Sequence, residues 1–497
     1  MATKQPNILF ILVDDLGWRD TGFYGSSFYE TPNIDKLCSE SLTFTDAYAA
    51  CPVCSPTRAS ILTGKYPATV GVTNYIDWKS GNHPAKGRLV DVSYFRELPL
   101  TERSLARSLR NHGYATWHVG KWHLGDKPCY PEHHGFEVNI GGCAQGTPGK
   151  NGHFSPWNIE SLRDVDVPPG TYLSDYLTDK AIELLRSHAS EERPFFLNLW
   201  YYAVHAPVQG KPEKVEKYKQ KAHRLGLDKE DPFETGNFYP AEHLKDKRIR
   251  RRKFQSDPSF AAMVETLDDN VGRVLTTLDE LQLSDNTLVI FTSDNGGLNS
   301  ANVSPTSNAP LSEGKGWMYE GGVREPLAVR WPGTVEPGRK TDALITSPDF
   351  YPTLLDVAGI PQMPDQHCDG ESFYPLLCGE SWQRSAPLFW HYPHYGNAGS
   401  TPGCSIRKGD WKLLEFFEDE HVELYNLRDD IGETNDRSAD EPGIASDLVA
   451  ELHAWQKRVL ARKPTANPDY VPWDKSEPSG HSSTVRADAL RVPQKTN

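Results

Sequence analysis

The sequence predicts an α/β fold, with a doubly wound, mostly parallel central sheet flanked by helices and a smaller antiparallel subdomain near the C-terminus. Continuous apolar runs such as residues 7–13 and 287–292 are typical of parallel strands that are buried on both faces. Amphipathic helical stretches such as 172–188 and 258–281 alternate with these runs. With 497 residues, the chain is also too long for one ordinary core.

The main-sheet elements are expected in a regular order along the chain. They are a strand over 7–13, a helix opening at 31–35, a short helix over 55–63, a helix over 102–112, a strand over 114–119, a helix over 172–188, a strand over 193–202, a helix over 258–281 and a strand over 287–292. Between them, residues 64–100 are expected to form a functional loop. Residues 208–255 form a charged insertion, which we expect to be surface helix and loop.

The chain changes character beyond Gly359, which indicates a second structural unit. Three strands joined by short turns and a final helix are predicted there, over 386–392, 405–417, 421–426 and 446–460. We therefore expect a main domain over residues 1–375 and a C-terminal α+β subdomain over 376–474. Residues 475–497 are polar and show no periodicity, so we expect a disordered tail.

The composition is that of a globular protein and argues against several classes of function. Hydrophobic residues make up 37% and charged residues 24% of the chain, and no apolar run reaches membrane-spanning length. The net charge of −14 argues against nucleic acid as the main partner. Eight scattered cysteines are too few for a disulfide scaffold, although they allow free thiols or one or two pairs. Without a signal peptide, the chain as given is expected in the cytoplasm; it is expected in the periplasm or outside the cell if a leader has been removed.

Polar side chains follow the predicted strands at their carboxyl ends. These residues are Asp14 and Asp15, Lys121 and His123, His205, and Asp294 and Asn295. Ligands bind at the carboxyl edge of open α/β sheets, so we expect these side chains to meet there. The four residues with carboxylate or amide oxygens offer hard ligands for one cation, and we expect Ca²⁺ because Mg²⁺ demands stricter octahedral geometry.

The stretch from Cys51 to Gly64 combines a helix start with a reactive sulfur. Ser55 is a candidate N-cap, the following proline suits the first helical position, and Gly64 suits a left-handed stop. Cys54 then lies just ahead of a helix N-terminus, which favours anions, and Arg58 lies one turn further on. These residues alone leave three interpretations open: a buried cysteine, a C-x-x-C redox pair of Cys51 and Cys54, or a site for a tetrahedral anion.

The sequence Cys54-Ser-Pro-Thr-Arg58, continued by Ala-Ser-Ile-Leu-Thr-Gly64, resembles the signature of the type I, formylglycine-dependent sulfatases of the alkaline-phosphatase-like superfamily. The resemblance covers residues 6–359 and implies the fold of that superfamily and hydrolysis of sulfate monoesters. It also implies that a formylglycine-generating enzyme converts Cys54 to formylglycine and that one Ca²⁺ is bound per chain. The catalytic positions implied are Cys54, Arg58, Lys121, His123, His205 and Lys315, and the metal positions are Asp14, Asp15, Cys54, Asp294 and Asn295.

In the mechanism that the resemblance implies, an oxygen of the hydrated aldehyde at residue 54 attacks sulfur while cationic side chains hold the sulfonate oxygens. His205 and Lys315 then act on the departing alkoxide, and His123 takes the proton that allows sulfate to leave. Two alternatives stay open. A phosphomonoester or phosphonate-ester hydrolase of the same superfamily would share this architecture. A non-catalytic binding or redox protein using Cys51 and Cys54 is the more distant one.

The substrate is expected to be a sulfated small molecule or glycan, with a carbohydrate preferred over a lipophilic aryl sulfate. Aromatic and polar residues expected around the pocket suit sugar faces and hydroxyls. They are Trp78, Asn82, His83, Arg88, Asn151, His153, Trp157, His391 and His394. The basic run 245–253 allows two interpretations, a solvated helix face or an anchor for a sulfated glycan.

Overall fold

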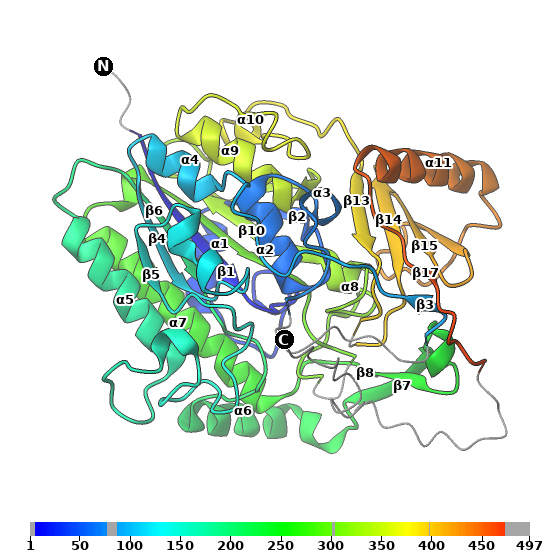
Figure 1. Ribbon diagram of the computed structural model, residues 1–497. Helices are drawn as coiled ribbons and strands as arrows, with labels where there is room; N and C mark the ends of the chain where they lie inside the picture. Colours follow the sequence, from blue (N-terminus) through cyan, green and yellow to red (C-terminus); the bar gives the residue numbers. More distant parts are fainter. Residues whose placement is uncertain (1–4, 77–86, 301–303, 397, 473–497) are drawn as a thin grey trace, which may run out of the picture.

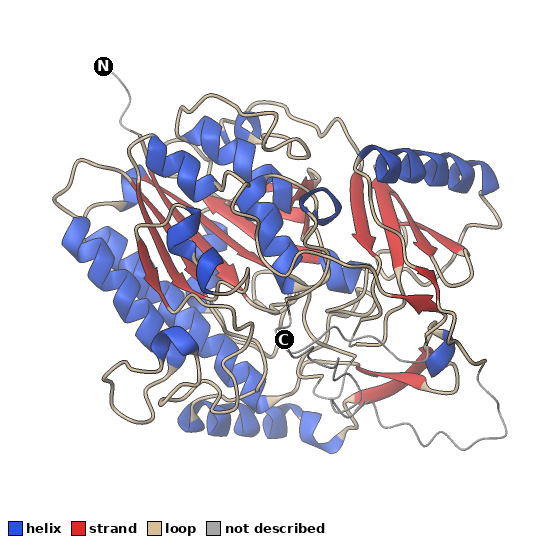
Figure 2. Ribbon diagram, viewed as in Figure 1, coloured by secondary structure: helices blue, strands red, loops and turns tan. Residues whose placement is uncertain are grey.

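The computed structural model describes residues 5–76, 87–300, 304–396 and 398–472. A large central sheet lies between layers of helices, and a second, smaller sheet stands beside it (Figures 1 and 2). Trp78, Asn82, His83 and the tail 475–497 lie outside the described residues, so the expectations for them remain predictions.

The central sheet has nine strands and is mostly parallel, as predicted. Its strand order is β11 (Lys340–Thr341), β2 (Leu42–Tyr48), β10 (Arg324–Arg330), β9 (Thr287–Ser293), β1 (Asn7–Val13), β6 (Phe195–Trp200), β4 (Ala115–Gly120) and β5 (Val138–Ile140), with β12 (Ile345–Thr346) also pairing with β2. The five strands from β9 to β5 are all parallel to their neighbours. Only β10 runs antiparallel, against both β9 and β2, and neither β2 nor β10 was predicted from the sequence.

Side chains of β1 alternate between two hydrophobic layers. Leu9, Ile11 and Val13 pack on the face covered by α1, α5 and α7, and the alternate residues of β1 face α2, α4, α9 and α10. All seven residues of β1 are buried, which explains its continuous apolar sequence. The α-helices outside the C-terminal region are α1 (Pro32–Ser39), α2 (Cys54–Thr63), α3 (Pro67–Val70), α4 (Leu105–Asn111), α5 (Leu173–His188), α6 (Pro212–Leu225), α7 (Pro258–Glu280), α8 (Glu320–Val323), α9 (Phe350–Val357) and α10 (Tyr374–Leu377).

The second sheet is antiparallel and packs against the main sheet on one face and a helix on the other. Its strands, in order, are β13 (Leu388–Tyr392), β14 (Gly403–Lys408), β15 (Trp411–Phe416) and β16 (Val422–Asn426). Residues 405–417, predicted as one strand, therefore form two, with Gly409 in a left-handed turn between them. Helix α11 (Pro442–Arg458) covers the outer face, where Trp455 stacks on Phe389 with ring centroids 4.6 Å apart.

The charged insertion contains more regular structure than expected. After α6, strands β7 (Phe233–Phe238) and β8 (Arg248–Arg252) pair as an antiparallel hairpin. The basic run 245–253 is therefore largely a strand, and the prediction of a helix face is wrong. A further short pair joins β3 (Leu89–Val90) to β17 (Thr465–Ala466). No helix in the described part of the chain combines the length and apolar character needed to cross a membrane.

Candidate active site

The four central parallel strands bring their terminal residues to one edge. The register places Val13 of β1 opposite Ser293 of β9, so the acidic pair after β1 lies beside the Asp-Asn pair after β9. On the other side, Gly120 of β4 pairs with Trp200 of β6. The backbone N–H of Lys121 donates to the Trp200 carbonyl at 2.7 Å. All the residues predicted from the strand ends therefore meet at the carboxyl edge of β9, β1, β6 and β4.

Three buried carboxylates at this edge are each paired with a cation. The Lys121 Nζ donates to Asp14 Oδ2 at 2.7 Å. Lys315 Nζ lies 2.7 Å from each carboxylate oxygen of Asp15. In the third pair, Arg58 donates to Asp294. Three carboxylates and three cations leave the cluster close to neutral, and its stability depends on every pair because unpaired charges are costly to bury.

Helix α2 carries the third cation into the centre of the site. The Nε of Arg58 donates to Asp294 Oδ2 at 2.8 Å, and its Nη1 donates to the Lys121 carbonyl at 2.9 Å. The guanidinium lies over the Trp200 ring, 5.3 Å from its centroid, and Arg58 is completely buried. One face of the guanidinium thus packs on Trp200, and its Nε and Nη1 groups are hydrogen-bonded, so Arg58 holds Asp294 in a fixed position.

The start of α2 differs from the sequence prediction. The helix begins at Cys54 itself, with Val53 at the N-cap position, so Ser55 is not the cap. Its hydroxyl instead donates to the His123 carbonyl at 2.9 Å and accepts from the Ile76 N–H at 3.0 Å. The predicted left-handed stop at Gly64 is confirmed, with φ of +68°.

His123 faces Cys54 with a defined ring orientation. Its Nδ1 lies 3.2 Å from Cys54 Sγ, and its Nε2 lies 2.8 Å from the Ile76 carbonyl. A carbonyl only accepts, so Nε2 carries the proton and Nδ1 turns its lone pair towards Cys54. Burial, with a smaller contribution from Lys121, holds the pKa of His123 well below its ordinary value. The backbone at Gly146 packs so closely on the imidazole that a Cβ there would lie 2.2 Å from Cε1.

His205 and Lys315 both lie beside Asp15. His205 Nε2 lies 3.7 Å from Asp15 Oδ2, and its Nδ1 donates to the Ala206 carbonyl at 2.7 Å. Burial acts to raise the pKa of Asp15, but Lys315 and His205 outweigh it and hold that pKa below its usual range. The Lys315 backbone N–H donates to the Gly297 carbonyl.

The second sheet supports the loop that carries Lys315. Glu320, five residues further on, is fully buried and accepts from Lys412 of β15 at 2.9 Å. Its backbone N–H donates to Glu433 at 2.7 Å. Lys412 also pairs with Glu433, and burial raises the pKa of Glu433 to about 8. The sequence carries no signal for this network, since a lone Lys in a strand is normally solvated.

The edge cluster has the donor set expected of a site for a hard cation. Oxygens of Asp14 and Asp294 lie within 4.8 Å of each other and of Cys54 Sγ, and Asp14, Asp15 and His205 form a second such group. Asp14 Oδ1 and Asn295 Oδ1 are buried and accept no hydrogen bond from the described residues. Burial also raises the pKa of Asp14 well above its usual range, although Lys121 opposes this. Unsatisfied oxygens beside carboxylates fit an oxygen-preferring divalent ion such as Ca²⁺.

A family model for sulfatases matches residues 6–360, which is most of the chain. The chain belongs to the sulfatase family. A second model, for the C-terminal region of N-sulphoglucosamine sulphohydrolase, matches residues 313–459. This sulfatase is 31% identical to a sulfatase of Formosa agariphila over 91% of this chain and 89% of that protein. It is 33% identical to the N-acetylgalactosamine-6-sulfatase of Homo sapiens over 78% of this chain and 69% of the relative.

Solved structures agree with this assignment. The crystal structure of Ps i-CgsB in complex with k-i-k-neocarrahexaose superposes with a TM-score of 0.72. The two proteins are 28% identical, and the match covers 91% of this chain and 92% of the other. The predicted alkaline-phosphatase-like fold with its small antiparallel sheet is confirmed, and this sulfatase is a sulfuric ester hydrolase.

Several residues expected to rim the substrate pocket belong instead to the scaffold of this sulfatase. His153 is completely buried, and its Nε2 contacts the backbone carbonyl of His205 at 2.9 Å. Trp157, His391 and His394 are also buried, and His394 pairs with Asp91. Lone His and Trp residues in loops gave no sign of whether they face the solvent or the core.

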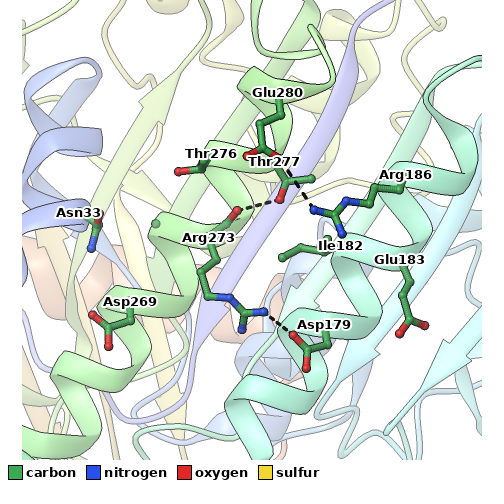
Figure 3. Close-up of a pocket in the computed structure, with 11 residues that line it drawn as sticks. Asn33, Asp179, Ile182, Glu183, Arg186, Asp269, Arg273, Thr276, Thr277 and Glu280 are labelled. Carbon is green, nitrogen blue, oxygen red and sulfur yellow. Dashed lines mark hydrogen bonds and ion pairs between the residues drawn. The ribbon is translucent and has the colours of Figure 1, made fainter.

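A polar groove of about 720 Å³ lies elsewhere, between α5 and α7 (Figure 3). Many of the side chains that line it are charged and form ion pairs with one another. Arg273 pairs with Asp179, and Arg186 pairs with Glu280. None of the candidate site residues lines it. The groove therefore contains none of the residues that the sequence predicts to carry the chemistry.

Proposed function

We propose that this sulfatase hydrolyses sulfate monoesters of carbohydrates, with a formylglycine formed from Cys54 as nucleophile and one Ca²⁺ as cofactor. The observation that carries the proposal is the meeting of Cys54 with three carboxylates and three cations at one buried sheet edge. Such a cluster is costly to assemble without a function, because the desolvation of each charge opposes folding.

Position 54 is suited to a nucleophile that must be held rigidly. Cys54 is the first residue of α2, where free backbone N–H groups favour an anion, and it is 3% exposed. Oxidation of this side chain by a formylglycine-generating enzyme would provide an aldehyde, which hydrates to a diol. His123 Nδ1 faces this position with its lone pair, so His123 is placed to take a proton from a hydroxyl there.

Asp14, Asp15, Asp294, Asn295 and residue 54 would hold the calcium ion. Bound there, Ca²⁺ would supply positive charge that lowers the pKa of a nearby hydroxyl and stabilises anionic sulfate oxygens. The paired cations of this site then become available for the substrate, since the ion takes over the neutralisation of the carboxylates. This exchange of partners explains why the site has as many cations as carboxylates.

Cationic side chains on the two sides of the cluster have distinct roles in this proposal. Lys121 and Lys315 each reach the cluster through a flexible Nζ that can turn from a carboxylate to a sulfonate oxygen. Arg58 holds Asp294 and adds to the positive potential. Lys315 and His205 lie together beside Asp15, which places them to assist the departing alkoxide.

The carbohydrate assignment is supported by relatives of this chain. One is named for the sulfate of N-acetylgalactosamine, and a structural neighbour was solved with a neocarrahexaose. A panel of sulfated mono- and oligosaccharides, an aryl sulfate and a steroid sulfate, compared by kcat/KM, tests it. We expect at least one sulfated sugar to exceed the steroid sulfate, and a steroid sulfate that outperforms every sugar would overturn the carbohydrate assignment.

The alternatives from the sequence are tested with the same preparation. An aryl phosphate hydrolysed faster than the matched aryl sulfate would favour a phosphoester hydrolase. The redox alternative requires Cys51, yet Cys51 and Cys54 form no disulfide, and burial raises the pKa of the Cys51 thiol far above its usual range. We expect Cys51→Ser to retain hydrolysis of an aryl sulfate, and its complete loss in a folded variant would count against the proposal.

A further inference from the structure

The outward face of the β7–β8 hairpin carries arginines that no carboxylate of the described residues neutralises. Arg248 and Arg250 are both exposed, and within the described residues neither makes an ion pair. The guanidinium of Arg250 lies 3.8 Å from the centroid of the Phe233 ring, and that of Arg248 lies 5.3 Å from Phe238. Phe238 is itself 57% exposed. We call these four residues the arginine face.

Neighbouring arginines of the same strand behave differently. Arg252 is buried, pairs with Asp257 and donates to the Ser304 carbonyl. Arg251 is partly buried and pairs with Glu313 at 2.6 Å. The C-terminal arginines of the strand, Arg251 and Arg252, therefore attach the hairpin to the protein, whereas Arg248 and Arg250 have no anionic partner among the described residues. In a chain with a net charge of −14, an unneutralised cationic face indicates an anionic ligand.

The hairpin is attached to the loop that carries Lys315. Glu313, the partner of Arg251, comes two residues before Lys315. Tyr239, which follows β7, stacks on Trp317, two residues after Lys315, with ring centroids 6.3 Å apart. Figure 1 shows β7 and β8 on the side of the main sheet opposite the N-terminus, the side to which the parallel strands run. The arginine face thus belongs to the same side of the molecule as the site.

We propose that the arginine face binds sulfate groups of a sulfated polysaccharide whose own sulfate ester is hydrolysed at residue 54. The inference rests on the proposed function, because it names the surface that binds the part of a glycan substrate lying beyond the active site. A guanidinium presents a fork of donors that matches the oxygens of a tetrahedral anion. Stacking on Phe233 and Phe238 restrains both guanidinium groups before binding, which lowers the entropy lost on binding, and an exposed ring suits the apolar face of a sugar.

Binding to immobilised chondroitin sulfate tests the proposal without requiring turnover. The test variant is Arg248→Gln/Arg250→Gln. The control, Arg110→Gln/Arg186→Gln, removes the same charge from exposed arginines in the last turns of α4 and α5. Hyaluronan, which carries carboxylates but no sulfate, serves as the reference matrix. We expect the wild type and the control to elute from chondroitin sulfate at similar salt concentrations, above those for hyaluronan, and the test variant to elute earlier.

Three results would overturn the inference: no preference of the wild type for chondroitin sulfate over hyaluronan, equal elution of the test variant and the wild type, or equally early elution of the control. Turnover gives an independent measurement. With a sulfated disaccharide the test variant should match the wild type, whereas its KM for long chondroitin sulfate fragments should rise about three- to tenfold at low salt, as two lost surface ion contacts would predict. An equal loss on both substrates would instead indicate distortion of the Lys315 loop and contradict the inference. Failure of the wild type to hydrolyse any sulfate ester would contradict the proposed function, and the binding measurement would still decide the inference.

Discussion

Calcium should stabilise the fold, because the edge cluster buries three carboxylates and two oxygens that accept no hydrogen bond. At a free Ca²⁺ concentration about one hundred times its Kd, binding to the native state alone adds about 2.7 kcal/mol to the free energy of unfolding. With an unfolding entropy of about 2 cal/mol/K per residue, the 497-residue chain changes in stability by about 1 kcal/mol per degree near its Tm. The expected increase in Tm is therefore about 3 °C.

Differential scanning calorimetry with Ca²⁺, with Mg²⁺ and with a chelator measures this shift. Asp294→Asn should lose most of the increase, because the change removes a charged ligand and leaves the side chain nearly the same size. Asp179→Asn, which removes a surface carboxylate of the α5–α7 groove, should keep it. A shift of the same size in Asp294→Asn, or no shift in the wild type, would refute the assignment of the cation to the edge cluster.

Three further predictions follow from individual contacts. Arg58→Met should lower the free energy of unfolding in urea by about 3–5 kcal/mol, because it leaves a buried carboxylate unpaired, and a loss below about 1 kcal/mol would contradict the pairing. Because His205 lies on the leaving-group side, His205→Ala should reduce kcat/KM most for unactivated sugar sulfates, whereas His123→Ala should slow the release of sulfate, lower kcat alike for activated and unactivated esters and accumulate sulfated enzyme; equal losses on both classes of ester for both variants would reject the division. The carboxylates of Glu423 and Asp419 raise the pKa of His421 to about 9, so these pairs stabilise the fold fully below pH 6.5 and lose their effect as the pH rises through 9; His421→Gln should lower the urea midpoint at pH 6 but not at pH 10, and equal losses at both pH values would exclude this origin.

The strands that position the site were predictable because parallel strands buried on both faces have continuous apolar sequences. Strand β2, which lies between β10 and the short strands β11 and β12, alternates apolar and polar residues over 42–45, which is a weaker signal. Strand β10 was missed because Pro326 lies within it, and proline normally argues against a strand interior. The register of β10 against β2 shifts between Glu325 and Leu327, so the proline is accommodated at an irregularity that the sequence does not reveal.

The residues of the site were predictable from their positions after strands, but their contacts were not. Asp14 and Asp294 were expected to approach each other because β1 and β9 end at the same edge. The role of Ser55 was assigned wrongly, since helix α2 begins two residues earlier than its N-cap signal suggests. The rim was assigned wrongly at His153 because the burial of a lone loop histidine depends on distant segments.

The structure of the basic run 245–253 also could not be predicted from its sequence. Its composition permits a helix, and only the structure shows that Arg251 and Arg252 attach the hairpin while Arg248 and Arg250 face outwards. Alternation along a strand assigns Arg250 and Arg251 to different surroundings, although they are neighbours in the sequence.

The mass of residue 54 in active protein tests the central claim most directly. Mass spectrometry of the peptide that contains position 54 should be performed on preparations whose kcat on an aryl sulfate has been measured per chain. We predict that formylglycine is present there, that its fraction rises in proportion to kcat when a formylglycine-generating enzyme is co-expressed, and that Cys54→Ala is inactive but folded. Full activity in protein whose residue 54 has only the mass of unmodified cysteine would contradict the account.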